Sequence, residues 1–157
     1  MRKAQRQKDA DWALEVFDKA PYVTVSMTRP DGTPYGLPLS LVRSGKGTFY
    51  FHCAHEGEKI DCLKYNPMVS LSAVSKCTPK FEEEKNNFTE YYHSAVALGR
   101  AEIVTDDTEK TEALRLLCQR FLPGYMNHFD EAITRSLDRT TIVRITLTEP
   151  PVGKSKP

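Results

Sequence analysis

Lys59 and Gly57 are the residues whose types and spacing point most directly to chemistry. A strand rich in aromatic residues is predicted over residues 48–53, and a short helix opens at Gly57 and ends at residue 66. The N–H groups of a first helical turn, the positive end of the helix dipole and a lysine ammonium all favour negative charge. The pattern therefore predicts an anion pocket that fits a phosphorylated ligand, and the alternative is that Lys59 is an ordinary solvated helix lysine.

His52 stands at the end of the same predicted strand and has three interpretations. It is a packed barrel histidine, a group beside a bound ligand that hydrogen-bonds or relays a proton, or a zinc ligand together with Cys53 and His55. Neighbouring strand residues point to opposite faces, and zinc needs three or four converging ligands. We therefore predict no metal site.

Tyr92 and Ser94 lie two residues apart on a later strand and are expected to share a face directed at a ligand. His93, between them, is expected on the opposite face as polar surface or as a subunit contact. Cys118 is expected in the core, because it lies on the apolar stripe of a helix.

The composition indicates a globular protein of 157 residues with a net charge of +1. Residues 1–150 are expected to form a single domain and residues 151–157 a disordered tail. The basic residues among the first eight are expected to be a solvated terminus. The charge balance argues against general nucleic-acid binding, and no apolar run suits a membrane span. Four cysteines without a CxxC pair favour free thiols in the cytoplasm.

The hydrophobic pattern predicts mostly strands joined by short turns. Pro38 removes a ladder donor from its strand and so predicts an edge, a bulge or a ligand contact. Gly99 is the expected bend point of one long strand. The expected elements are helices at 9–19, 57–65, 106–121 and 128–138, strands at 22–28, 34–43, 48–53, 68–76, 88–105 and 140–148, and a loop at 77–87.

These elements predict a mainly β, α+β fold, namely a six-stranded antiparallel split β-barrel with helices at the N-terminus, inserted, and in the C-terminal half. The glycine-rich fingerprint of a doubly wound dinucleotide-binding sheet and the phosphate-binding loop of nucleotide triphosphatases are both absent from the sequence. A bound nucleotide would therefore lie on a barrel.

Five short segments carry a resemblance to a known family. They are LPLSLV (37–42), FYFHCA (49–54), GEK (57–59), NPMVSLS (66–72) and YYHSAVALGRAEIV (91–104). In this order they resemble the FMN-binding split-barrel flavoproteins, which include pyridoxamine 5'-phosphate oxidase and its relatives. The YFH, YxSAVxxGRA and FLPG (121–124) motifs are most similar to the 5-nitroimidazole reductase branch, which is linked to nitroimidazole antibiotic resistance.

The resemblance implies a homodimer with two FMN sites at the subunit interface. Lys59 would pair with the FMN phosphate. Tyr92 and Ser94 would reach the site from the long strand, either of the same chain or of the partner chain. The cofactor-binding residues that the resemblance implies are Pro38, Leu39, Ser40, His52, Cys53, Gly57, Lys59, Tyr92 and Ser94.

The leading hypothesis is an FMN-dependent oxidoreductase that reduces a small planar acceptor, with a nitro-aromatic such as a 5-nitroimidazole as one candidate. His52 would supply a proton as the catalytic residue, and NAD(P)H would be the electron donor. Two alternatives remain open at this point. One is a flavin or heme carrier without turnover, with His52, His55 or His93 as an axial ligand, and the other is a dimer that serves only interaction.

Overall fold

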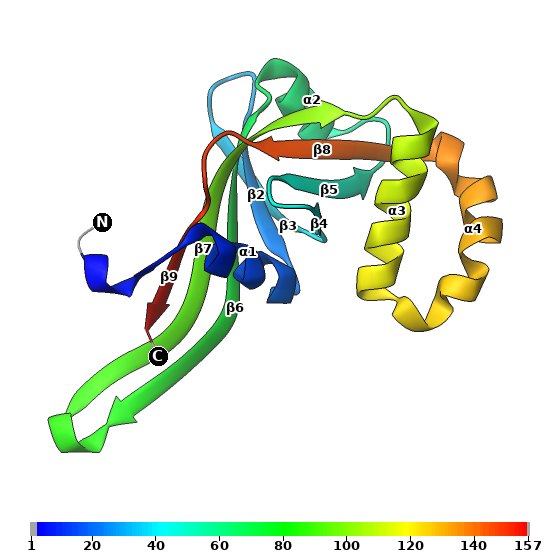
Figure 1. The fold of residues 1–157 in the computed structure, drawn as a ribbon. Helices are drawn as coiled ribbons and strands as arrows, with labels where there is room; N and C mark the ends of the chain where they lie inside the picture. Colours follow the sequence, from blue (N-terminus) through cyan, green and yellow to red (C-terminus); the bar gives the residue numbers. More distant parts are fainter. Residues whose placement is uncertain (1–2, 157) are drawn as a thin grey trace.

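The computed structural model describes residues 3–156 and is built mainly from antiparallel strands (Figure 1). The strands form from short segments rich in β-branched and aromatic residues, which are separated by turns. Buried and more exposed residues alternate along them, because successive side chains point to opposite faces of the sheet. Within the described residues the strands are β1 (Gln7–Lys8), β2 (Val23–Thr28), β3 (Pro34–Leu39), β4 (Val42–Ser44), β5 (Thr48–Cys53), β6 (Met68–Glu82), β7 (Asn87–Ile103), β8 (Thr141–Leu147) and β9 (Val152–Lys156).

Helices interrupt the strands where the hydrophobic period changes to that of a helix. Asp9 caps the first one, because its side chain accepts a hydrogen bond from the Trp12 N–H at 2.8 Å. The α-helices are α1 (Ala10–Lys19), α2 (Glu58–Tyr65), α3 (Asp107–Phe121) and α4 (Phe129–Ser136), and the 3-10 helices are η1 (Ala4–Arg6), η2 (Glu83–Lys85), η3 (Pro123–His128) and η4 (Leu137–Arg139).

The strand order in the sheet is β3-β2-β6-β7-β8-β5-β4, and β9 adds to β7 while β1 adds to β9. The sheet curls without closing, which is the predicted α+β split barrel. The number of strands differs from the predicted six for two reasons. The expected strand at 34–43 breaks at Ser40 and Leu41 into β3 and β4, and short strands form near both ends of the described chain.

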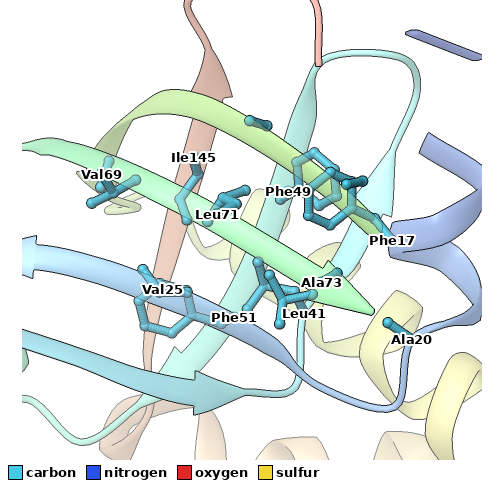
Figure 2. Packing of buried hydrophobic residues seen from close by; sticks show 14 of the residues in the cluster. Phe17, Ala20, Val25, Leu41, Phe49, Phe51, Val69, Leu71, Ala73 and Ile145 are labelled. Atoms are coloured by element: carbon cyan, nitrogen blue, oxygen red, sulfur yellow. The ribbon is translucent and has the colours of Figure 1, made fainter. Parts of the chain in front are cut away.

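The barrel interior is an apolar core to which β2, β5, β6, β7 and β8 all contribute (Figure 2). The phenyl rings of Phe17 and Phe49 pack edge to face with centroids 5.3 Å apart, which joins α1 to the sheet. A second cluster lies between α3 and the sheet and includes Leu117 and Ile142. Figure 1 shows α3 and α4 together at one side of the barrel, next to β5 and β8.

The expected loop at 77–87 is wrong, because β6 and β7 continue as a paired ribbon as far as Glu82 and Asn87. This ribbon extends away from the barrel (Figure 1). Its residues are mostly exposed on both faces, so the sequence lacks the alternation of polar and apolar residues that normally marks a strand. We call residues 77–92 the arm. A bulge between Val74 and Lys76 precedes it on β6.

The expected disordered tail at 151–157 is also wrong over its described part. Residues Val152–Lys156 form β9, which pairs with β7 on one side and with β1 on the other. Gly153 lies against the indole of Trp12, and the Ser155 side chain is buried. The tail is ordered because an unpaired edge of β7 is available to it, a tertiary effect that no local sequence pattern indicates.

Candidate functional site

The turn that follows β5 ends at Gly57, whose backbone requires a glycine. Its φ of 121° lies in a region that L side chains rarely adopt, and a β-carbon there would meet no other atom. The constraint is therefore conformational rather than steric. The Gly57 carbonyl accepts hydrogen bonds from Ile60 and Asp61 at 2.9 and 3.2 Å, which starts α2, and no side chain caps this end of the helix. The N–H groups of Glu58 and Lys59, which precede these two donors, are the ones left for a ligand.

Lys59 lies half-buried in the first turn of α2, next to this open helix end. It forms no ion pair with any carboxylate of residues 3–156, whereas the neighbouring Glu58 is paired with Arg29. Burial raises the pKa of the Cys53 thiol, and the charge of Lys59 partly offsets the rise, so the ammonium lies close to the end of β5. A free cation at an uncapped helix start has the chemistry of an anion site.

β5 presents its last two residues to opposite faces, as the pleat requires. The His52 side chain is exposed, and Cys53 packs against the main core. His55 lies after the strand and is held at both ring nitrogens, with Nδ1 2.6 Å from Thr141 Oγ1 and Nε2 2.6 Å from the Asp138 carbonyl oxygen. His52, Cys53 and His55 therefore do not converge, and His55 is a structural link to β8 rather than a ligand.

His52 opens onto a groove of about 510 Å³ between the end of β5 and the helices α3 and α4. Ser40, at the end of β3, lines the same groove, and most of the remaining lining is apolar. The helical part of the lining comprises Leu114, Leu117, Cys118, Phe121, Leu122, Tyr125, Met126, His128, Phe129, Ala132, Ile133 and Ser136. A concave apolar surface of this size with a few polar groups suits a small planar molecule.

Pro38 and Leu39 lie on β3, which is an edge strand of the sheet, and this confirms the expectation for the proline. Pro38 is exposed, while Leu39 is half-buried against the core. The chain then bends at Ser40 toward the groove. The structure therefore brings Ser40 and His52 to one groove, and it places Cys53, Gly57 and Lys59 around the start of α2.

Tyr92 and Ser94 share the outer face of β7, as predicted, but they lie far from this groove within one chain. Phe51, next to His52 on β5, stands opposite Val143 of β8, and Val143 stands opposite Ile103 of β7. Tyr92 is eleven residues from Ile103 along β7, which corresponds to roughly 36 Å of extended strand. One protomer therefore does not bring Tyr92 and Ser94 to His52.

His93 lies on the opposite face and contacts Trp12 edge to face at 5.2 Å between ring centroids. Burial is the first cause that lowers its pKa, and three lysines add to the effect. His93 is therefore half-buried against α1 and is not the open polar surface that was one of the two expectations, while the subunit contact stays a prediction.

The sequence reasoning missed the groove residues on η3 and at the start of α4, of which Tyr125 and His128 are the most polar. The apolar stripe of α3 was the available signal. Leu114 and Leu117 from that stripe are buried, as expected of a core face, although both also reach the groove. Cys118, expected in the core, is only half-buried and lines the groove together with Phe121. The last turn of α3 and the turn that follows it thus form a surface rather than a core.

The arrangement of strands and helices is that of a split barrel of the pyridoxamine 5'-phosphate oxidase-like fold. A family model described as pyridoxamine 5'-phosphate oxidase matches residues 9–152. The chain belongs to this family. No curated protein sequence matches the chain significantly.

Solved structures support the same fold. A candidate 5-nitroimidazole antibiotic resistance protein from Bacteroides thetaiotaomicron aligns with a TM-score of 0.77 and 19% identity over 95% of this chain and 88% of the other. A flavocytochrome from Azotobacter vinelandii aligns with a TM-score of 0.85 and 20% identity over 100% and 72%. An FAD- and heme-binding protein from Mycobacterium smegmatis aligns with a TM-score of 0.82 and 21% identity over 96% and 73%. In the described part of the chain, no helix has the length and apolarity of a membrane span.

Proposed function

We propose that this protein is an FMN-dependent oxidoreductase that reduces a small planar acceptor, with a nitro-aromatic ring such as a 5-nitroimidazole as the candidate substrate. One observation carries the proposal. The uncapped start of α2, with Lys59 in its first turn, follows the same strand from which His52 lines an apolar groove. A phosphate held at one point and a planar ring held at the other is the arrangement that a flavin mononucleotide and its substrate require.

The residues present fit the cofactor. Lys59 and the N–H groups of Glu58 and Lys59 would hold the phosphate. Pro38, Leu39, Ser40 and His52 would lie along the rest of the molecule, and Cys53, whose side chain packs against the core, would contribute its backbone. When bound, FMN would supply the electron transfer. The chain itself would bind and orient the acceptor in the groove and exclude water from it through the apolar side chains of α3 and η3. The His52 imidazole would hold a proton at the edge of the groove.

The donor of the electrons is proposed to be NAD(P)H, and the working form a homodimer in the cytoplasm. The outer face of β6 and β7 favours a dimer, because it exposes Met68, Val74, Val96 and Leu98 by 41, 51, 50 and 40%. An apolar sheet face of this kind is usually covered by a second copy. A dimer would also allow Tyr92 and Ser94 to reach the site of the partner.

Titration of the protein with FMN tests the proposal directly, with quenching of flavin fluorescence as the readout. Lys59→Gln removes the cation at the helix start, and loss of one charge-assisted phosphate contact weakens binding by about 10- to 150-fold. Lys64→Gln, in the last turn of the same helix, is the matched control and should bind FMN like the wild type. Equal affinities for both variants, or no quenching by the wild type, would refute the proposal.

A second candidate function is a heme carrier, and the groove is the observation that favours it. His52 and His128 both line this apolar cavity, whereas His55 and His93 are engaged elsewhere. A Soret band in protein purified from cells, lost in His52→Ala, would support heme. A yellow flavin spectrum without a Soret band would exclude it.

A further inference from the structure

The edge formed by β1 and β9 carries basic side chains that form no ion pairs with carboxylates of residues 3–156. Lys154 of β9 stands opposite Ser94 of β7 on one side and Gln7 of β1 on the other, and Lys156 stands opposite Tyr92. The pleat turns Lys154 to the outer face, on which Tyr92 and Ser94 lie, whereas the side chain of Lys156 reaches Thr89. These cations are therefore held by a sheet and are not part of a solvated tail.

The Tyr92 phenol is the centre of this cluster. Desolvation would raise the pKa of the phenol, but hydrogen bonding and charge from Arg6 and Lys154 outweigh it, so the pKa is lowered. Arg6 comes from η1, directly before β1. Lys156 donates a hydrogen bond to Thr89 Oγ1, and its ammonium lies 5.4 Å from the centre of the Tyr91 ring. Arg6 from η1 and Lys154 from β9 thus lie beside Tyr92, whereas the Lys156 ammonium lies beside Thr89 and Tyr91, which share the other face of β7.

Carboxylates pair with cations elsewhere in the fold but not here. Lys19, Lys46, Arg43 and Arg144 each form an ion pair. Among residues 3–156, Arg6, Lys154 and Lys156 form none. Lys156 helps to lower the pKa of Glu82, which accepts hydrogen bonds from Asn87 and Tyr91. Glu90, two residues from Tyr92 on β7, accepts a hydrogen bond from the Cys77 thiol. Because the chain carries a net charge of only +1, the surplus on this edge is local.

We propose that Arg6 and Lys154, which lie beside Tyr92, form a second anion-binding site for a phosphate group of a dinucleotide. Guanidinium and ammonium groups with a neighbouring phenol are the donors that phosphate oxygens accept. This site differs from the start of α2, where Lys59 would hold the phosphate of FMN. Its relation to the flavin rests on the proposed function, since only the proposed dimer would bring the outer face of β7 to the flavin of the partner.

Two molecules carry the phosphate chemistry that this site requires. One is FAD, whose adenylate half adds a second phosphate to that of FMN. The other is NADPH, whose phosphates would dock on the edge strands while its nicotinamide approaches the flavin. Both molecules contain a pyrophosphate group, so free pyrophosphate is a common probe of the site, and titrations with FAD and NADPH distinguish the two ligands.

Isothermal titration of the full chain with pyrophosphate measures the site without any catalytic readout. Arg6→Gln and Lys154→Gln should each weaken pyrophosphate binding about tenfold or more, as expected for loss of a charged hydrogen-bond donor. Lys64→Gln removes an equally unpaired surface lysine and should leave the affinity unchanged. Thermal unfolding of each variant, with an unchanged midpoint expected, separates loss of the site from loss of β9.

The same variants are then titrated with FMN, FAD and NADPH. Weaker binding of FAD with unchanged FMN affinity assigns the site to the flavin dinucleotide, and weaker binding of NADPH alone assigns it to the electron donor. If Lys154→Gln and Lys64→Gln behave alike with every probe, the second anion site is refuted. If FMN fails to bind while pyrophosphate still responds to Lys154→Gln, the proposed function fails and the second site stands.

Discussion

Substitution of Gly153 by alanine tests whether the last described strand is packed on the barrel. A β-carbon at this position would lie 2.4 Å from Cε3 and 2.8 Å from Cζ3 of Trp12, and 3.0 Å from Cβ of Lys8. The position of the indole is also constrained by the His93 ring, which it contacts edge to face. The added methyl group therefore forces the indole, β9 or both to shift.

The expected cost is that of overpacking a well-packed site, about 1–3 kcal/mol. For a chain of this size each kcal/mol lowers the melting temperature by about 2–4 °C, so Gly153→Ala should melt about 2–12 °C below the wild type. Trp12 is the only tryptophan in the chain, so its fluorescence reports the same contact. A more solvated indole in the variant should emit at longer wavelength.

Gly124→Ala is the matched control, since a β-carbon there meets no atom within 4 Å and the backbone needs no positive φ. Its melting temperature and tryptophan emission should stay close to those of the wild type. If both variants unfold at the same temperature with the same emission, Val152–Lys156 is not docked, and the second anion site loses its foundation.

Three further predictions concern other parts of the molecule. Burial and the hydrogen bond to Glu109 raise the pKa of Tyr50 to about 12 from 10.0. The contribution of this phenol to stability is therefore complete below pH 10 and is lost as the pH rises toward 12. In denaturant unfolding, the free energy of unfolding of Tyr50→Phe should fall less steeply above pH 10 than that of the wild type. His55→Ala should lower the free energy of unfolding by about 1–3 kcal/mol because it leaves the buried Thr141 hydroxyl without this partner. His52→Ala should instead lower turnover without a change in melting temperature, and the reverse pattern would contradict the assignment of the two histidines. Val96→Lys should convert a dimer of twice the 17.8 kDa chain mass into monomers in sedimentation, and an unchanged sedimentation profile would place the subunit interface elsewhere.

The corner at Gly57 was predictable from the sequence because its determinants are local. A glycine with positive φ, a helix start and a lysine two residues later lie within one short segment, and the alternation of His52 and Cys53 follows from the pleat alone. The proline at position 38 likewise indicated an edge strand by its missing N–H.

Other features depended on partners far away in the chain. His55 is fixed by groups 83 and 86 residues downstream. Its distance from His52 along the sequence therefore could not decide whether it is a ligand or a structural residue. The segment that forms β9 is short and polar, and its order comes from the free edge of β7 and from Trp12. The arm has no buried face and therefore leaves no hydrophobic period in the sequence.

The arm has a consequence for how the molecule opens. Beyond Cys77 and Tyr92 the two strands pair only with each other, since the register with β9 ends at Lys156. A two-stranded ribbon is at best marginally stable in water. Its amide protons should therefore exchange with solvent through local opening, at a far lower free energy than those of the barrel strands to which it is continuous. One pair of strands thus joins well-protected backbone in the barrel to poorly protected backbone in the arm, and the bulge at residue 75 lies near the boundary.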